Sequence, residues 1–398
     1  MGFDSLTRRY FIKRAGQFGA ALVLGENILT RNAIAQATEK SFEQTVFPGK
    51  EKMTVLSSKP IVLEMPANGF EHFITPTDMF FVRNNIGMPV IDINKWSLAV
   101  DGEVNTTLRL SMDDIKKFKE VEAVVTLECY GNSRYFFKPK TAGNQWKKGG
   151  IGTARWKGVR LKDIIEKAGI TDKSKHVVFD GADEPFAPGA PDFKRSIPID
   201  KALDPNTLLV YEMNGMPLPV YHGYPLRALV PGWGGSAFVK WLITINISEK
   251  EFEGFYMVYK YRYPKSPVSP GTKVSPRDMT VLTELDVKSI ITRPIDGEKV
   301  SSRDMTITGY AWTGEAEIKK VEVSTDLGRT WHKAKIIRNG GRYVWSLWEY
   351  KWRADRTGFY VLMSKATDTR GRMQPLHQDW NQDGYLYNVA DKVGVHVV

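Results

Sequence analysis

Residues 124–134 read V-V-T-L-E-C-Y-G-N-S-R, and this stretch decides how the fold of the chain is interpreted. Its first half is apolar and rich in β-branched residues, which predicts a short buried strand. The polar run 131–133 that follows is typical of a tight turn. We therefore expect Cys129 to be held rigidly at the end of a buried strand, just before a turn that leads to Arg134.

Cys129 is the only cysteine among the 398 residues, so it has no disulfide partner within the chain. A thiolate is a soft metal ligand, and the nearby Arg134 is expected to favour the ionised form of this thiol. A buried free cysteine that acts only as a small apolar side chain is the alternative. This stretch alone leaves both interpretations open.

The composition predicts a loop-rich chain that contains β-structure and has enough apolar residues for a sizeable core. Hydrophobic residues make up 42% of the sequence, and there are 34 glycines and 21 prolines. The length favours two or three domains. The net charge of +11 is scattered, which argues against nucleic-acid binding and is compatible with anionic substrates or an acidic redox partner. No apolar run is long enough to predict a membrane span.

Residues 1–35 have the pattern of an export signal. The pair Arg8 and Arg9 precedes bulky apolar residues and a weakly apolar run, and an A-I-A cleavage pattern closes the segment. This order is typical of a twin-arginine signal peptide that is removed after export. We therefore predict a mature protein in the periplasm. An amphipathic N-terminal helix that stays in place is the alternative.

The sequence between residues 75 and 211 predicts short strands with two helices among them. Helices are expected at 111–118, where Ser111 is a good N-cap, and at 161–168, which ends at Gly169. Strands are expected at 79–82, 177–179 and 208–211. Arg83 follows the first of these strands, where it is either a surface ion-pair former or an anion ligand.

The stretch 221–241 is the second part of the sequence that is dense in chemically active residues. It places His222, Arg227 and Lys240 among four glycines and two prolines. Backbone N–H groups in glycine-rich turns, with cations beside them, predict a cradle for an oxyanion or a phosphate. Neither a Walker A motif nor a dinucleotide fingerprint is present. A purely structural role for His222 is the alternative.

From about Val287 the sequence changes to recurrent short β-rich segments. Strands are expected at 305–312, 320–324, 343–352 and 359–367, a spacing that predicts an immunoglobulin-type sandwich. The expected organisation is a signal peptide at 1–35, a first domain at 36–270, a linker at 271–286 and a sandwich domain at 287–398.

Five motifs in this order resemble the sulfite oxidase family of molybdenum-pterin enzymes. They are T-P-T-D-M-F-F-V-R-N-N (75–85), L-E-C-Y-G-N-S-R (127–134), G-G-I-G-T-A-R-W-K-G-V-R-L (149–161), Y-E-M-N-G-M-P-L-P (211–219) and H-G-Y-P-L-R-A-L-V-P-G (222–232). Residues 309–331 resemble the family's C-terminal dimerisation domain. The resemblance implies an α+β protein: a mixed α/β molybdopterin-binding domain of sulfite oxidase type, then an all-β immunoglobulin-like sandwich that forms a homodimer.

The resemblance also implies roles for individual residues. Cys129 matches the cysteine whose sulfur ligates molybdenum, which implies one molybdenum-molybdopterin cofactor per chain. The residues that match positions holding the pyranopterin and its phosphate are Phe81, Val82, Asn84, Asn85, Asp183, His222, Arg227, Phe238, Val239 and Lys240. The residues that match the substrate pocket are Arg83, Arg134, Trp146 and Tyr261.

The activity implied by the resemblance is oxidation of sulfite to sulfate by oxygen transfer. The sequence has no C-x-x-C-H motif for haem attachment, so we expect electrons to pass to a separate periplasmic cytochrome c. Asn85 and Asp383 stand where relatives have a histidine and, in vertebrate-type enzymes, an arginine, which bears on the substrate. The enzymatic alternatives are a sulfane dehydrogenase subunit and a reductase of S- or N-oxides. The non-enzymatic alternative is an exported immunoglobulin-like binding protein without metal.

Overall fold

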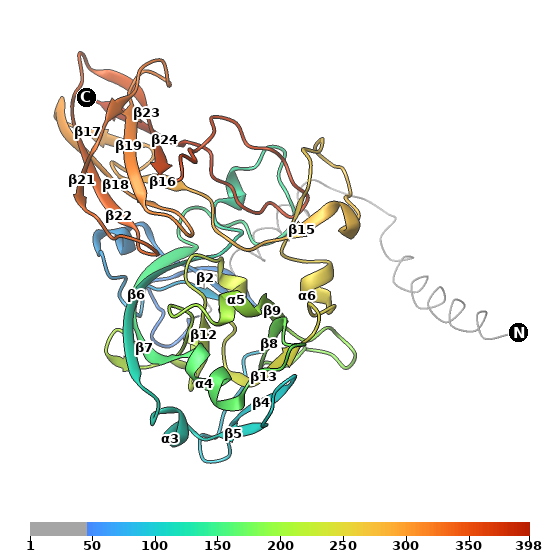
Figure 1. The fold of residues 1–398 in the computed structure, drawn as a ribbon. Coiled ribbons are helices and arrows are strands. Elements are labelled where there is room, and N and C mark those ends of the chain that lie inside the picture. The colour runs from blue at the N-terminus through green and yellow to red at the C-terminus, as the bar shows by residue number, and fades with distance from the viewer. Residues whose placement is uncertain (1–45) are drawn as a thin grey trace, which may run out of the picture. The chain divides into compact units, whose positions relative to one another are not determined.

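The computed structural model of the chain describes residues 46–398, which Figure 1 shows as a coloured ribbon. The predicted signal peptide at 1–35 lies outside the described residues. Strands make up most of the regular structure, and the helices are short. Within 46–398, no helix has the length and apolar character that crossing a membrane requires.

Within the described residues, three sheets build the first domain. A small antiparallel sheet has the order β1 (Thr54–Ser58), β2 (Ile61–Glu64) and β3 (Val82–Arg83). A second sheet has the order β11 (Met216–Pro217), β10 (Leu208–Met213), β7 (Ile151–Arg160) and β6 (Glu120–Glu128), and β12 (Arg227–Leu229) also pairs with β10. A third has the order β5 (Leu108–Leu110), β4 (Leu98–Gly102), β13 (Leu242–Ser248), β8 (His176–Gly181) and β9 (Lys194–Pro198).

Strand β6 positions Cys129. It pairs with β7 in an antiparallel ladder that runs along its whole length. The ladder ends where the backbone N–H of Cys129 donates to the carbonyl of Gly150 at 2.9 Å. The chain then turns, and the N–H of Asn132 donates to the carbonyl of Cys129 at 2.8 Å. The predicted strand is therefore confirmed, and Cys129 directly follows its last residue.

The helices of the first domain are single turns or little longer. Helix α4 (Leu161–Ala168) confirms the helix predicted at 161–168. Helix α3 (Met112–Ile115) is shorter than the predicted helix at 111–118, because the chain must turn to enter β6. Among the described residues, the other helices are α5 (Ile199–Ala202), α6 (Phe255–Val258), and the 3-10 turns η1 (Ala67–Glu71), η2 (Arg134–Phe136), η3 (Val220–His222) and η4 (Gly235–Ala237), while η5 (Pro276–Asp278) lies in the predicted linker.

The predicted strand at 79–82 is largely wrong. Met79 is part of a turn in which its N–H donates to the carbonyl of Pro76 at 2.9 Å, and pairing begins only at Val82. Phe80 and Phe81 are buried and stack on each other, with ring centroids 5.4 Å apart. Their apolar character therefore reflects burial in a loop, which periodicity alone does not distinguish from a strand.

The second domain is a two-layer sandwich, as predicted. One sheet has the order β16 (Lys288–Arg293), β18 (Asp304–Trp312), β22 (Ser346–Arg353) and β21 (Lys335–Arg338). The other has the order β17 (Glu298–Val300), β24 (Asp391–Val397), β23 (Gly358–Asp368), β19 (Ile318–Ser324) and β20 (His332–Lys333). Ile307, Trp348 and Leu362 are fully buried between the layers. A two-stranded ribbon, β14 (Arg262–Pro264) with β15 (Met279–Val281), precedes the sandwich.

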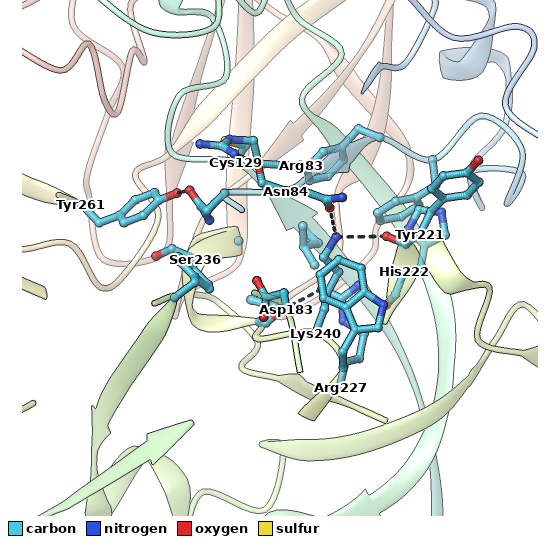
Figure 2. Close-up of a pocket in the computed structure, with 18 residues that line it drawn as sticks. Arg83, Asn84, Cys129, Asp183, Tyr221, His222, Arg227, Ser236, Lys240 and Tyr261 are labelled. Carbon is cyan, nitrogen blue, oxygen red and sulfur yellow. Dashed lines mark hydrogen bonds between the residues drawn. The ribbon is translucent and has the colours of Figure 1, made fainter. Parts of the chain in front are cut away.

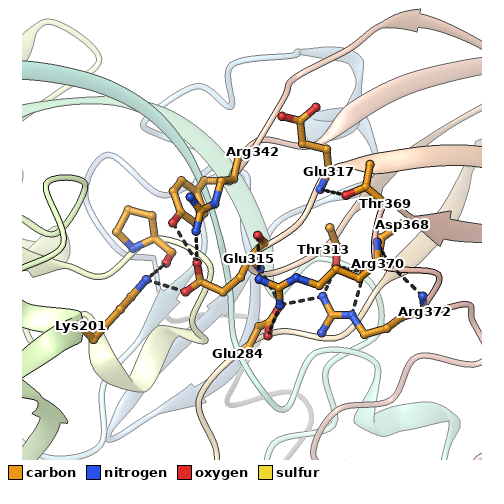
Figure 3. A network of polar contacts seen from close by, with 12 residues as sticks. Lys201, Glu284, Thr313, Glu315, Glu317, Arg342, Asp368, Thr369, Arg370 and Arg372 are labelled. Carbon is orange, nitrogen blue, oxygen red and sulfur yellow. Dashed lines mark hydrogen bonds and ion pairs between the residues drawn. The ribbon is translucent and has the colours of Figure 1, made fainter.

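Polar contacts join the sandwich to the first domain (Figure 3). Lys201 of α5 donates to Glu315 of the second domain at 2.6 Å, and Arg342 donates to the same carboxylate at 2.7 Å. Close by, Arg372 donates to Glu284 at 2.6 Å. The predicted domain boundaries at residues 36, 271 and 287 stay predictions.

The burial of Ile307 generates a test of the sandwich core. We expect Ile307→Ala to lower the free energy of unfolding by about 2–5 kcal/mol, because it removes a fully buried side chain and leaves a cavity. Ile337 of β21 is 42% exposed, so Ile337→Ala is the matched control, with an effect of under about 1 kcal/mol. Urea denaturation followed by tryptophan fluorescence measures both. Equal effects would contradict the predicted core.

Candidate active site

A cavity lies where the end of β6 meets the segment 80–85 around β3 and the glycine-rich stretch 221–241 (Figure 2). Polar and aromatic side chains from distant parts of the chain converge on it. The residues that line it are Phe80, Phe81, Arg83, Asn84, Asn85, Leu127, Cys129, Asp183, Phe193, Tyr221, His222, Arg227, Gly235, Ser236, Phe238, Lys240, Trp241 and Tyr261. The two chemically dense stretches of the sequence therefore meet in one place.

Cys129 is the thiol at one wall of this cavity, and it is 8% exposed. Burial raises the pKa of this thiol, while the charges of Arg83 and Arg134 oppose the rise. The expectation that Arg134 favours the thiolate is thus correct in direction, but burial outweighs it. Within residues 46–398, no group of three or more His, Cys, Asp or Glu side chains is arranged to hold a metal. A metal at Cys129 would therefore need further ligands from a bound cofactor.

Buried cations dominate the electrostatics of the cavity. Burial lowers the pKa of Arg227 to about 9. The pKa of Lys240 is also lowered, first by burial and then by the charge of Arg227. The pKa of His222 lies well below its usual value, for which burial and then Lys50 are the main causes. Burial raises the pKa of Asp183 to about 7, against the effect of Lys240. Each cation would be stabilised by an anion in the cavity.

One cation of this group, Lys50, is absent from the predicted site residues. Its ammonium group donates to the carbonyl of Phe80 at 2.8 Å and lies 2.8 Å from Nε2 of His222. Burial lowers the pKa of Lys50 to about 7. No local sequence signal identifies this lysine, because its partners lie 30 and 172 residues further along the chain.

Several buried polar atoms in the cavity have no hydrogen-bond partner among the described residues. They are Nδ2 of Asn84, Oδ1 of Asp183, Oγ of Ser236 and Nε of Arg227. Because buried polar groups are normally paired, these atoms indicate a site built for a polar ligand. Together with the buried cations, they fit the phosphate and the hydrogen-bonding ring edges of a molybdopterin.

Glycine permits the close approach of two of these cations. Gly223 has a φ of 107°, and a Cβ atom there would lie 3.0 Å from Cβ of Lys240 and 3.1 Å from Cβ of Arg227. The left-handed backbone and the short distances both favour glycine at this position. The predicted placement of cations beside a glycine-rich turn is consistent with this geometry.

Arg134 is buried next to the cavity but does not line it. Its Nε donates to the backbone carbonyl of Asp383 at 2.8 Å, and Nη1 donates to the carbonyl of Asn144 at 3.0 Å. The carboxylate of Asp383 pairs with Lys260 at 3.0 Å. Asp383 stands where vertebrate-type relatives have an arginine. Its backbone carbonyl orients Arg134, while Lys260 neutralises the carboxylate of Asp383.

Tyr261 lies at the wall opposite the cation cluster. Its hydroxyl donates to Oδ1 of Asn85 at 2.7 Å, and its ring stacks on Tyr385 with the centroids 5.5 Å apart. The backbone of Tyr261 has a φ of 55°, which is uncommon for a non-glycine residue and is often found at functional sites. Arg195 is buried behind it, with the guanidinium carbon 5.1 Å from the centroid of the Tyr261 ring.

The structure thus brings together most of the predicted site residues. Four of them do not line the cavity: Val82, Arg134, Trp146 and Val239. Trp146 is fully buried behind Phe81, with ring centroids 5.8 Å apart. The lining residues that the sequence analysis missed are Phe80, Leu127, Phe193, Tyr221, Gly235, Ser236 and Trp241. Most of these are apolar or small, and their types carry no chemical signal in a sequence.

The depressed pKa of Lys50 predicts how pH affects binding of an anionic cofactor. A bound anion raises this pKa above about 7, so binding takes up a proton. We therefore expect retention of the cofactor to weaken as pH rises from 7 to 9, by up to about tenfold per pH unit. The fraction of cofactor lost during dialysis at each pH measures this retention. In Lys50→Met, we expect cofactor retention to depend less steeply on pH. An equal pH dependence of cofactor retention in the wild type and in Lys50→Met would contradict the role of Lys50 in binding the anion.

Two family models match the chain. The oxidoreductase molybdopterin binding domain matches residues 85–256, and the Mo-co oxidoreductase dimerisation domain matches residues 279–398. The first model covers Cys129 and the glycine-rich stretch 221–241. The second covers the whole sandwich, from β16 to β24.

Related proteins include animal sulfite oxidases. The mitochondrial sulfite oxidase of Homo sapiens is 36% identical over 361 residues, which cover 87% of this chain and 66% of the human protein. The sulfite oxidase of Gallus gallus is 35% identical, with 85% of this chain and 77% of the chicken protein covered. The crystal structure of the sulfane dehydrogenase SoxCD from Paracoccus pantotrophus has a TM-score of 0.74 and 25% identity, with 89% of this chain and 88% of the other covered.

The chain spans just under two thirds of the human enzyme, and a larger share of the chicken enzyme. The matches extend over both domains, and the cavity has the charge and the unpaired polar atoms that a molybdopterin requires. The chain belongs to the sulfite oxidase family of molybdopterin oxidoreductases, and its cofactor is molybdenum-molybdopterin.

Proposed function

We propose that this chain oxidises sulfite to sulfate at a molybdenum centre ligated by Cys129 and passes the electrons to a separate cytochrome c. The observation that carries this proposal is the position of Cys129, which lies at the wall of a cavity that is rich in buried cations. The sequence identity to animal sulfite oxidases supports it.

The residues around Cys129 divide into two groups in this proposal. Lys240, Arg227, His222 and Ser236 hold the cofactor, since cations and a hydroxyl suit a phosphate group. Arg83 lines the cavity beside Cys129 and presents a guanidinium fork, which suits the pyramidal oxyanion of sulfite. When bound, the molybdenum-pterin group supplies the oxygen atom and accepts the electron pair.

Arg134 and Tyr261 complete the substrate side of the site. Arg134 is fixed by two backbone carbonyls, so its charge acts from a constant position without a carboxylate to neutralise it. The hydroxyl of Tyr261 donates to Oδ1 of Asn85, so in this proposal it turns from Asn85 to donate to an oxygen of the substrate. Trp146 supports this region from behind through Phe81.

Oxidation of a sulfane sulfur is the second candidate function. The structural likeness to the sulfane dehydrogenase SoxCD over most of both chains favours it. Asn85 and Asp383 also distinguish this chain from relatives with a histidine and an arginine there.

The twin-arginine export to the periplasm, the homodimer and the cytochrome c partner are part of the same proposal. The dimerisation-domain match over 279–398 supports the homodimer.

A comparison of substrates tests the proposal directly. We expect the purified holoenzyme to contain about one molybdenum per chain and to reduce cytochrome c faster with sulfite than with thiosulfate. With a reduced dye as electron donor, we expect it to reduce a sulfoxide only slowly. Cys129→Ser should stay folded, by circular dichroism, but lose this activity, because the hydroxyl is a harder and poorer ligand than a thiolate. Normal sulfite turnover by Cys129→Ser would show that the ligand assignment is wrong, and a preference for thiosulfate would favour the sulfane alternative.

Substitution of Arg134 tests the substrate side. Arg134→Ala should raise the KM for sulfite by the equivalent of about 2–4 kcal/mol, because the positive charge next to the cavity that would stabilise a bound anion is lost. Arg155 is the matched control, since it forms an exposed ion pair with Glu122 at 2.7 Å away from the cavity. Steady-state kinetics of both variants measure the difference. An unchanged KM for Arg134→Ala would remove Arg134 from the site.

A further inference from the structure

Glu128 immediately precedes Cys129, and its buried carboxylate receives donors from both domains. Oε1 accepts from Nδ2 of Asn132 at 2.9 Å and from Nζ of Lys288 at 3.0 Å. Oε2 accepts from Nε1 of Trp312 at 2.7 Å. Lys288 and Trp312 belong to β16 and β18 of the sandwich. The residue next to the thiol is therefore fixed by the second domain.

Lys288 also reaches the residue that precedes Arg134. Its Nζ donates to Oγ of Ser133 at 3.0 Å, in addition to its bond with Glu128. Ser133 has a φ of 73°, a conformation that a non-glycine residue adopts only with support from its surroundings. One ammonium group thus contacts both ends of the turn between Cys129 and Arg134.

The ion pair between Glu128 and Lys288 is almost completely buried, with side-chain exposures of 7% and 5%. A buried pair of this kind is a weak source of net stability, because desolvation offsets much of the attraction. Its best-attested use is to select one arrangement of the groups around it. Here those groups are the thiol and the guanidinium of the candidate active site.

We propose that Glu128 and Lys288 are positioning residues that hold Cys129 and Arg134 at a fixed separation. The sandwich domain is then part of the active-site scaffold as well as a dimerisation domain. The kinetic consequence rests on the proposed function, whereas the structural consequence for the turn does not.

The chain offers a matched control for this proposal. Lys201 and Glu315 form another ion pair between the two domains, at 2.6 Å and with side-chain exposures of 9% and 15%. This pair does not contact Cys129, Arg134 or the residues between them. Loss of either lysine should weaken the junction of the domains, but only loss of Lys288 should disturb the turn.

The experiment compares Lys288→Met with Lys201→Met in the full-length holoenzyme. We expect Lys288→Met to raise the KM for sulfite about tenfold while kcat changes less than about threefold, because displacement of Arg134 weakens anion binding. Amides of residues 129–136 should exchange hydrogen about tenfold faster in this variant. Lys201→Met should leave the KM and the exchange of these amides unchanged, although its Tm falls.

A double variant separates positioning from stability. Glu128→Gln combined with Lys288→Met leaves no unpaired buried charge, so its Tm should recover relative to Lys288→Met. Its KM should stay high, because Ser133 still has no lysine to hold it. Recovery of both Tm and KM would show that the pair acts only through stability and would overturn the proposal.

Further outcomes also decide the matter. If Lys288→Met does not fold, Ser133→Ala removes the hydroxyl acceptor alone, and we then expect a KM increase of about threefold. Identical KM and amide exchange in Lys288→Met and Lys201→Met would contradict the proposal. A wild-type holoenzyme that does not oxidise sulfite would contradict the proposed function, while the exchange comparison would still decide the role of the pair.

Discussion

The structure depends on the burial of several cations around one cavity. The buried Arg227 and the half-buried Arg83 and Lys240 line it, and the buried Lys50 contacts His222. Asp183 is the carboxylate that lines the cavity among the described residues, and burial raises its pKa to about 7. Concentrated positive charge of this kind opposes folding unless an anion neutralises it. The molybdopterin cofactor of the family, which is anionic, therefore serves the stability of the site as well as its chemistry.

The reactive wall of the cavity is held by rigid elements. The β6–β7 ladder delivers Cys129 at its end, and the turn after it is fastened by Asn132 and Gly150. Arg134 is fixed by two backbone carbonyls, and no carboxylate within residues 46–398 forms an ion pair with it. A thiol and a guanidinium held in this way are pre-organised, which is the arrangement that the proposed roles of Cys129 and Arg134 require.

The second domain contributes more to this wall than its name as a dimerisation domain implies. Lys288 and Trp312 reach across the domain junction to the carboxylate beside Cys129. The ion pairs of Lys201 and Arg372 contribute to the same junction (Figure 3), and their residues do not line the cavity. Lys288 contacts Glu128 and Ser133 on either side of the turn after Cys129, whereas Lys201 and Arg372 contact neither residue. A comparison of their variants therefore distinguishes an effect on stability from the proposed effect on the active site.

The sequence by itself determined the local features of this protein. The β-branched run before Cys129, the glycines and cations of 221–241 and the regular spacing after Val287 each depend on neighbours in the chain, so their patterns could be read directly. The motifs also identified the family and most of the cavity. The apolar residues at 79–82 were misinterpreted as a strand, because burial in a loop gives the same pattern as burial in a sheet.

Only the tertiary structure decided which charges meet. Lys50 and His222 are 172 residues apart, and Lys288 and Glu128 are 160 apart, so no local pattern predicts either contact. The tertiary structure also decided how Asp383 affects the site. Its backbone carbonyl holds Arg134, while Lys260 neutralises its carboxylate. The burial of a group sets its pKa and its partners, and burial is a property of the whole fold.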